Sequence, residues 1–392
     1  MVAIRYGADA IYIGGEEFSL RAKATNFSIS SMKDCVKIAH ENSVKVYVTA
    51  NIYAHNADLE AIKDYFYELN DVGPDAVLIS DIGVLNLAKS ILKNIDIHLS
   101  TQANTTNYET VKFMRDLGVK RVVLARELSL DEIKTIKREV GDSIEIECFV
   151  HGSMCISYSG RCLLSAYMAG KSANSGLCTH PCRWKYMLLE ESERKGEYMP
   201  VIETDRGTYI FNSKDLNMIE HVDDLIEAKI DSLKIEGRMK SPLYVAIVTR
   251  TYRKAIDDYL KDKELYNKNQ ELYKSEIGKC TYREYTTGFY YGKPDENTQI
   301  YDNSTYIKGA VFYGIISRVD DEYAYLEQKN KFSVGDTITV MKPDFSNLTV
   351  KVLAIYDEET NKELTSCSHA KEKLKVKFDK KLEVLDVLRS ND

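Results

Sequence analysis

The feature that most constrains the fold is a repeated unit in which a short run rich in Val, Ile and Tyr precedes a helical stretch of roughly 15 to 25 residues. Strands that alternate with helices at this spacing form parallel βαβ units. Many such units within about 250 residues suit a TIM-like (β/α)8 barrel better than an open sheet. The expected strands are Ala10–Gly15, Val44–Asn51, Ala76–Asp81, Ile95–Gln102, Arg121–Arg126, Ile144–His151 and Ser232–Gly237.

These seven runs are one fewer than a closed eight-stranded barrel requires. The first run begins close to Met1, so we expect either a barrel that lacks its first strand and helix, or another segment in their place. We therefore predict an α/β fold with an incomplete TIM-like barrel over residues 1–265.

Three further segments are expected. Residues 152–229 break the rhythm of strands and helices and form a Cys-rich insertion. Residues 266–304 are polar and Tyr-rich, and we expect a linker or extended arm there. Residues 305–392 predict a small antiparallel β-barrel domain, because short alternating segments are separated by turn signals. Those segments are Tyr323–Leu326, Thr337–Met341, Val350–Ile355 and Leu374–Phe378.

Composition and charge narrow the class of protein. The 392 residues include 53 Lys and Arg against 60 Asp and Glu, and the net charge of -7 argues against indiscriminate binding of nucleic acid. No apolar run approaches the ~18 residues that cross a bilayer, and Arg5 and Asp9 interrupt the start of the chain. We expect a cytoplasmic protein with no membrane partner, in which clustered cysteines serve as metal ligands or redox groups.

Four of the eight cysteines follow the pattern Cys155-x6-Cys162-x15-Cys178-x3-Cys182. Thiolates this dense need a positive partner, which a metal supplies. The spacing favours a [4Fe-4S] cluster over zinc, since structural zinc usually has two short CxxC-type knuckles; unligated thiols are the other alternative. Cys148 alternates with apolar residues in an expected strand and is interpreted as a core thiol. The remaining cysteines, Cys35, Cys280 and Cys367, are interpreted as structural or incidental.

Several motifs together resemble peptidase family U32, and the cysteine block and Lys234–Ser241 are its most specific parts. The resemblance covers residues 6–255, and the tail motif Lys329–Asp336 is similar to the C-terminal β-domain of this family. The other matching motifs are Tyr6–Gly15, Phe18–Arg21, Phe149–Ser153, Tyr158–Cys162 and Asn212–Leu216.

The resemblance implies an activity and its cofactors. Although the family was named for collagenase-like proteolysis, its better understood branches are oxygen-independent hydroxylases with an iron-sulfur cluster. They act on the wobble uridine of tRNA, on ribosomal RNA or on ubiquinone precursors. The arrangement here is most similar to the branch that forms 5-hydroxyuridine in tRNA and depends on prephenate. By this resemblance Cys155, Cys162, Cys178 and Cys182 hold the cluster, tRNA and prephenate are partners, and iron-sulfur assembly or electron-donor proteins are further partners.

In a (β/α)8 barrel the chemistry lies at the C-terminal ends of the strands. The polar residues at those ends include Glu16, Asn51, Asp81, Gln102 and Glu127. Our candidate catalytic residues are His151, Glu236 and Arg238. Guanidinium and ammonium groups bind carboxylate or phosphate, so the candidate substrate-binding residues are Arg21, Arg126, Arg161, Lys234 and Lys240. The alternative is that these arginines pair with Glu127 or Glu236 to hold loops, and that His151 is a structural strand-end residue.

Two other functional classes stay open. The stretch Lys234–Lys254 has six basic residues against Glu236, which suits RNA phosphates, although a solvated helix face explains its C-terminal part equally well. A U32-type peptidase would need a nucleophile, and Cys155 with His151 is conceivable, but neither H-E-x-x-H nor a strand-borne G-x-S-x-G is present. A metal-stabilised RNA-binding or maturation scaffold without catalysis is the third possibility.

Overall fold

The computed structural model divides into two compact units. The first, here called the barrel unit, comprises Asp9–Met239 and Arg283–Tyr306. The second, the tail unit, comprises Met1–Ala8, Lys240–Tyr282 and Ile307–Asp392. The residues that the structure describes are 1–19, 26–154, 162, 164–169, 171, 177–179, 181–183, 203–204, 207–208, 213–292, 306–369 and 371–390.

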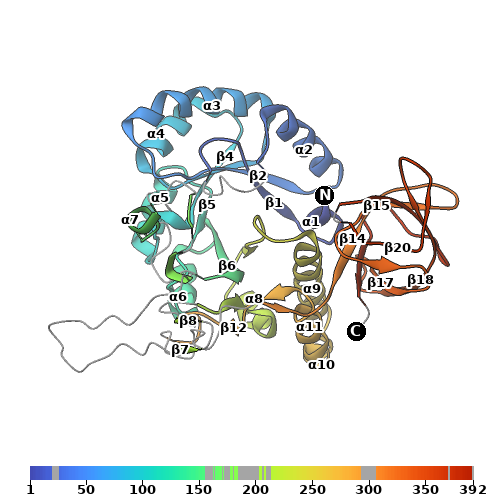
Figure 1. Cartoon of the computed structure of the whole chain (residues 1–392). Coiled ribbons are helices and arrows are strands. Elements are labelled where there is room, and N and C mark those ends of the chain that lie inside the picture. The colour runs from blue at the N-terminus through green and yellow to red at the C-terminus, as the bar shows by residue number, and fades with distance from the viewer. Residues whose placement is uncertain are drawn as a thin grey trace. The chain divides into compact units, whose positions relative to one another are not determined.

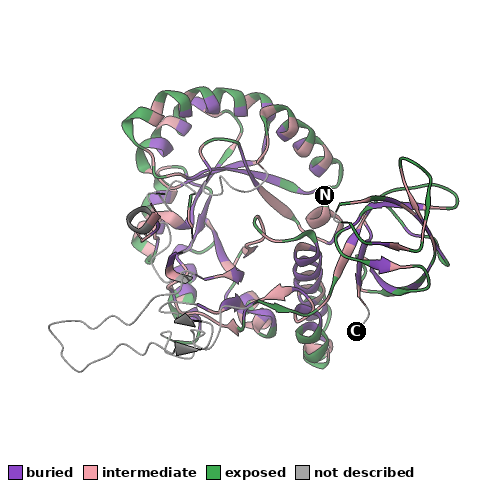
Figure 2. Ribbon diagram, viewed as in Figure 1, coloured by how far each residue is buried: buried purple, intermediate pink, exposed green. Residues whose placement is uncertain are grey.

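Seven parallel strands of the barrel unit pair in chain order, which confirms the strands expected from the sequence (Figure 1). Apolar buried residues make up most of β2, β3 and β5, as parallel strands covered by helices require (Figure 2). The strands are β1 (Ala10–Gly14), β2 (Lys45–Ala50), β3 (Ala76–Ile79), β4 (Asp96–Leu99), β5 (Arg121–Val123), β6 (Glu145–Ser153) and β10 (Ser232–Ile235).

Amphipathic helices cover the outside of this sheet. In the second of them, buried residues recur at helical spacing: Ile62, Tyr65, Phe66 and Leu69 face the strands. Short polar side chains start several of these helices; Asp81 Oδ1, for example, accepts a hydrogen bond from the Val84 amide. These helices are α2 (Ile29–Glu41), α3 (Leu59–Val72), α4 (Ile82–Ile91), α5 (Tyr108–Asp116) and α6 (Leu130–Val140); the barrel unit also contains α7 (Leu164–Ala169) and α8 (Val222–Glu227).

A side-chain hydrogen bond connects β1 and β10, the first and last of the seven strands. No backbone pairing joins β10 to β1 within the described part of the chain. Instead, the Tyr12 hydroxyl donates to the Ile235 carbonyl at 3.3 Å. The C-terminal part of β6 also pairs antiparallel with β9 (Asp215–Asn217), which in turn pairs with β12 (Tyr285–Thr286). Residues 152–229 therefore add a strand and α8 to the barrel unit, besides the hairpin of β7 (Glu203–Thr204) and β8 (Gly207–Thr208).

The tail unit contains the antiparallel β-barrel that the sequence predicts. Its strands follow the order β17-β22-β14-β15-β21-β18, and pairing of β17 with β18 closes the ring. Closure removes exposed strand edges, and side chains such as Ile316, Val340 and Leu374 fill the interior. The strands are β14 (Phe312–Val319), β15 (Ala324–Glu327), β17 (Thr337–Met341), β18 (Asn347–Asp357), β21 (Lys373–Phe378) and β22 (Val387–Ser390), with short β16 (Phe332–Ser333), β19 (Glu363–Leu364) and β20 (Ser366–Cys367).

Helices from both ends of the barrel sequence belong to the tail unit, in contrast to the expected boundary at residue 265. Buried ion pairs explain this grouping: Glu276 bonds Arg250 at 2.6 Å and Arg389 at 3.2 Å. The Tyr6 hydroxyl donates to the Met341 carbonyl at 2.8 Å. The helices are α1 (Val2–Arg5), α9 (Pro242–Lys261), α10 (Lys263–Lys268) and α11 (Gln270–Ile277).

Residues 266–304 are expected to form a linker or extended arm, but the first part of this segment forms regular secondary structure. Residues up to Ile277 are helical, and β11 (Thr281–Tyr282) pairs with β13 (Ile307–Lys308). Tyr266 and Tyr273 are buried in this helical part, where the Tyr273 hydroxyl donates to Asp258 at 2.6 Å and its ring stacks near Tyr266. Residues 293–305 lie outside the described chain. No helix among the described residues has the length and apolar character needed to cross a membrane.

Candidate active site

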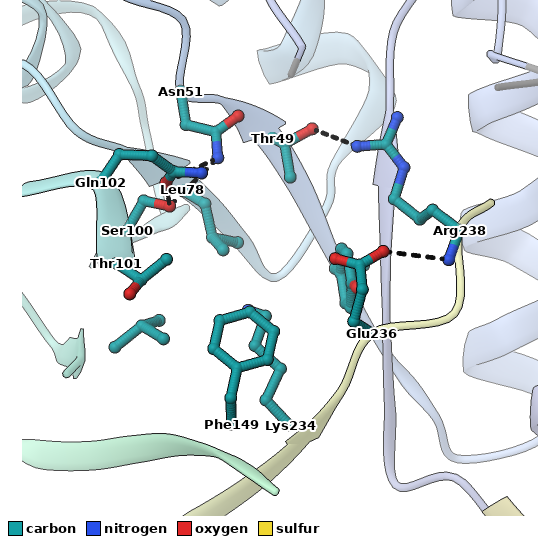
Figure 3. A pocket seen from close by; sticks show the side chains of 12 residues that line it. Thr49, Asn51, Leu78, Ser100, Thr101, Gln102, Phe149, Lys234, Glu236 and Arg238 are labelled. Atoms are coloured by element: carbon teal, nitrogen blue, oxygen red, sulfur yellow. Dashed lines mark hydrogen bonds between the residues drawn. The ribbon is translucent and has the colours of Figure 1, made fainter. Parts of the chain in front are cut away.

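A small pocket opens at the C-terminal ends of the barrel strands, where barrel enzymes place their chemistry (Figure 3). We call it the barrel-mouth pocket. Strands from all round the sheet contribute to it, which is why its residues are far apart in the sequence. Its lining consists of Tyr12, Thr49, Asn51, Leu78, Ser100, Thr101, Gln102, Val123, Phe149, Lys234, Glu236 and Arg238.

A chain of buried charges lies beneath the pocket. Lys234 Nζ donates to Glu147 Oε1 at 2.6 Å and lies 4.6 Å from the centre of the Tyr12 ring. Glu147 Oε2 accepts hydrogen bonds from Arg121 at 3.0 Å and from Ser232 at 2.8 Å. Glu147 is only 3% exposed, so both carboxylate oxygens depend on these partners. The network fixes the Lys234 ammonium between the Tyr12 and Phe149 rings.

Electrostatics within the barrel follow from this network. Burial alone would raise the pKa of Glu147, but Lys234 and Arg121 outweigh it and lower that pKa to about 2. Burial, together with the Arg121 charge, lowers the pKa of His98 to about 3. At neutral pH Glu147 is therefore ionised and His98 is neutral, and Lys234 has a fixed counter-ion.

Arg238 forms one wall of the pocket and donates to neutral oxygens on three segments. Its guanidinium bonds Ser19 Oγ at 2.8 Å, Asn26 Oδ1 at 3.0 Å and Thr49 Oγ1 at 3.3 Å. Its backbone amide donates to Glu236 Oε1 at 3.3 Å, so the two candidate catalytic residues adjoin (Figure 3). These hydrogen bonds position a planar guanidinium, which can bind a carboxylate, at the wall of the pocket.

Gly14 leaves the space that the Arg238 guanidinium occupies. A Cβ at this position would collide with the Arg238 guanidinium and the Ser19 hydroxyl. We expect Gly14→Ala to displace Arg238 and to lower turnover by on the order of 100-fold, the cost of a small misplacement in a positioned site. Steady-state kinetics would measure this. The control is Gly278→Ala, whose new methyl group meets neighbours only at ordinary contact distance. Equal kinetics in both variants would contradict the role given to Gly14.

Amide and hydroxyl groups form the opposite wall. Asn51 follows β2, and its Nδ2 donates to Ser100 Oγ at 3.0 Å and to Gln102 Oε1 at 3.1 Å. The Ser100 hydroxyl in turn donates to Gln102 Oε1. Ser100 and Gln102 follow β4, so this wall joins the ends of two strands. Asn51 and Gln102 were among the strand-end candidates.

The other predicted site residues have different positions. Arg126 does not line the pocket, but its guanidinium lies 5.5 Å from the ring of Phe149, which does, and donates to the Ser153 carbonyl at 3.0 Å. His151 is 1% exposed on β6, with its ring near Tyr285, and it is not part of the lining. Lys240 belongs to the tail unit, where it lies over the Tyr244 ring. Arg21, Arg161 and Cys155 lie outside the described residues.

Three of the four clustered cysteines are described, and the segments that carry them are tied together. The buried Ser165 hydroxyl accepts a hydrogen bond from the Thr179 amide at 3.0 Å and contacts the Thr179 hydroxyl at 3.0 Å. This clip links α7, which begins just after Cys162, to the stretch that leads from Cys178 into the 3-10 turn Pro181–Arg183. None of the three cysteines forms a disulfide. Among described residues, no three His, Cys, Asp or Glu side chains are grouped as a metal site.

The remaining cysteines agree with their structural interpretation. Cys148 is 3% exposed in β6, and burial raises the pKa of its thiol. Cys280 and Cys367 are buried in the tail unit. Cys35 lies half-buried on α2.

The basic stretch Lys234–Lys254 is not an exposed phosphate-binding surface. Lys234 is buried against Glu147, and Arg250 is 1% exposed against Glu276. Arg253 pairs with Asp257 at 2.7 Å and Lys254 with Asp258 at 2.6 Å. Four of the six basic residues thus pair with acidic residues that lie outside the stretch, which the charges of the stretch alone do not reveal.

Two site features escaped the sequence interpretation. Glu147 and Arg121 were not chosen, although Glu145, Glu147 and Phe149 alternate with the apolar face of β6 and so mark its inward side. Tyr12 and Thr49 were also missed, because single aromatic and hydroxyl residues within strands carry no distinctive signal.

Comparisons with known proteins agree on the family. The model of "Peptidase family U32" matches residues 1–300, and that of "Peptidase family U32 C-terminal domain" matches residues 308–389. The tRNA hydroxylation protein P1 of Bacillus subtilis is 37% identical over 390 residues, 99% of this chain and 91% of that protein. The tRNA hydroxylation protein P of Escherichia coli is 38% identical, over 87% of this chain and 83% of its own. The 23S rRNA 5-hydroxycytidine C2501 synthase of Escherichia coli is 36% identical, over 67% and 38% respectively.

Proposed function

This chain belongs to peptidase family U32, and we propose that it is an RNA hydroxylase that converts the wobble uridine of tRNA to 5-hydroxyuridine without molecular oxygen. The observation that carries the proposal is the barrel-mouth pocket, where fixed cations, aromatic rings and amide groups converge at the C-terminal strand ends. Relatives that match almost the whole chain are named tRNA hydroxylation proteins, which supports tRNA as the substrate.

The four cysteines of the insertion fit an iron-sulfur cluster as a donor set. Four thiols lie within 28 residues, and the Ser165 clip holds two of the segments that carry them. Cys155, Cys162, Cys178 and Cys182 would hold a [4Fe-4S] cluster, which supplies one-electron transfer when it is bound. Replacing C5–H by C5–OH with an oxygen atom from water releases two electrons and two protons, so the reaction requires an electron-accepting partner protein.

Within the pocket, the chain's own residues position the reactants. Lys234 and Arg238 provide the two cations that a dicarboxylate such as prephenate requires, and the Tyr12 and Phe149 rings lie beside the Lys234 ammonium. Glu236 faces the same pocket and can accept the proton that leaves C5. Arg126 supports Phe149 from outside the lining.

Expression of the chain in a bacterial strain without endogenous tRNA hydroxylation tests this function. The expected result is 5-hydroxyuridine in digested tRNA, detected by mass spectrometry, from wild type but not from Arg238→Ala. Unchanged tRNA nucleosides, with the protein folded and carrying iron, would contradict the substrate assignment.

An exposed aromatic pair next to the pocket is a second feature that suits RNA. Tyr53, 54% exposed, lies two residues after Asn51, and its ring is 5.6 Å from that of His55. Unpaired bases stack on such side chains. We expect Tyr53→Ala to weaken tRNA binding by roughly tenfold or more, and Tyr53→Phe to preserve it. Fluorescence anisotropy would measure both. Tyr67→Ala, which removes a tyrosine 61% exposed on α3, is the control; an equal loss there would count against a role specific to Tyr53.

A further inference from the structure

One hydrogen-bond acceptor of the barrel-mouth pocket has no donor among the described residues. Asn51 is only 6% exposed, and its side-chain Oδ1 has no hydrogen-bond partner within the described residues. A buried amide oxygen without a donor is costly, and such atoms are rare in folded proteins. Because Asn51 also lines the pocket, a ligand that donates a hydrogen bond would satisfy it.

The orientation of this amide is fixed by its surroundings. Nδ2 donates to Ser100 Oγ and to Gln102 Oε1, which leaves Oδ1 on the opposite side of the amide. Figure 3 shows the oxygen pointing away from Gln102. The backbone is held as well, since the Asn51 amide donates to the Phe18 carbonyl at 3.1 Å and Ser80 Oγ donates to the Asn51 carbonyl at 3.2 Å. The acceptor is therefore preorganised for a donor from the ligand.

The other residues of the pocket restrict which ligand group can donate to Asn51 Oδ1. Carboxylates, which suit Lys234 and Arg238, are acceptors only and cannot satisfy Oδ1. The Tyr12 and Phe149 rings favour a flat molecule. A flat ring with an N–H on its edge meets both conditions, and the uracil base has one at N3. Enzymes that modify a base turn it out of the stack and recognise this edge.

We propose that Asn51 recognises the target base by accepting the N3–H of a uracil turned into the barrel-mouth pocket. This inference rests on the proposed function and adds the base-reading residue. It also gives a reason for selectivity: the N3 of cytosine is itself an acceptor, so it faces Oδ1 with like polarity and binds less well.

A binding cycle in which both the Asn51 side chain and the uracil N3–H are changed tests the contact between them. The full-length protein, wild type or Asn51→Ala, is titrated without co-substrate against an anticodon stem-loop RNA that has uridine or N3-methyluridine at the wobble position. We expect methylation to weaken binding to wild type by roughly tenfold or more, and the Asn51→Ala variant to bind both RNAs equally. Tyr67→Ala, which removes an exposed tyrosine on α3 outside the pocket lining, is the control and should keep the wild-type preference.

The outcomes separate this inference from the function it rests on. An equal methylation penalty in wild type and Asn51→Ala would overturn the Asn51 contact, while hydroxylation by wild type would leave the proposed function intact. Failure of wild type both to bind and to hydroxylate the uridine RNA would overturn the two together. If Asn51→Ala does not fold, Asn51→Ser, which keeps a small polar group, replaces it in the same cycle.

Discussion

Purified anaerobically, the wild-type chain is expected to contain about four irons and four acid-labile sulfides, and a variant with Cys155, Cys162, Cys178 and Cys182 all changed to Ala is expected to contain neither. The four thiolates are the only proposed source of bonds to the cluster, so their loss leaves nothing to hold it. Hydroxylation should fall to background in the same variant. Metal analysis with absorption and EPR spectra would measure the first effect.

The control for this variant is Cys35→Ala, which removes a half-buried thiol on α2. It should keep full iron, sulfide and activity. Zinc in place of iron in the wild-type protein would favour the scaffold alternative. Iron that survives the fourfold replacement would show that the ligands lie elsewhere.

Glu147→Gln is expected to have the largest effect on stability. Its carboxylate lies between Arg121 and Lys234, and an amide would leave the buried Lys234 without its counter-ion and Arg121 with Glu145 as its remaining carboxylate partner. Breaking a buried pair in this way costs roughly 3–5 kcal/mol of unfolding free energy. Urea unfolding at neutral pH would measure it. Glu145→Gln is the control, because Glu145 bonds the same arginine at 2.7 Å but its side chain is 34% exposed, and its loss should cost less than about 1 kcal/mol.

The Glu147 effect should also depend on pH. The pKa of this carboxyl is about 2 in the folded protein, below its ordinary value of 4.5. A lowered pKa contributes stability that is full above the ordinary value and is lost as pH falls through the folded value. The difference in stability between wild type and Glu147→Gln should therefore be constant above about pH 5 and should shrink toward pH 2. A difference that is the same at pH 3 and pH 7 would contradict the ionised network.

The sequence predicts the repeating architecture well because periodicity is a local property. Runs such as Ala76–Asp81 begin with four apolar residues, and β3 forms over those four, Ala76–Ile79. The tail barrel is predicted equally well. Polar and apolar residues alternate over Thr337–Met341, and β17 forms with the same bounds. Position at strand ends also brought Asn51, Gln102, Glu236 and Arg238 into consideration, and all four line one pocket.

What the sequence does not predict is pairing between distant charges. Arg250 belongs to a basic stretch in the sequence, but Glu276, 26 residues later, neutralises it in a buried site. Glu147 pairs with Arg121 and with Lys234, which belong to strands on either side of it. Strand order and burial determine which charged residues pair, and a local sequence pattern specifies neither property.

The most direct test of the central claim is an anaerobic assay of the iron-loaded, full-length protein with unmodified tRNA, prephenate and an electron-exchanging partner. We predict a tRNA in which the wobble uridine gains one oxygen atom, with product lost in Arg238→Ala and in the fourfold cysteine variant. Mass spectrometry of the digested RNA would detect it. A fully iron-loaded wild-type protein that binds this tRNA and leaves its uridine unchanged would contradict the account.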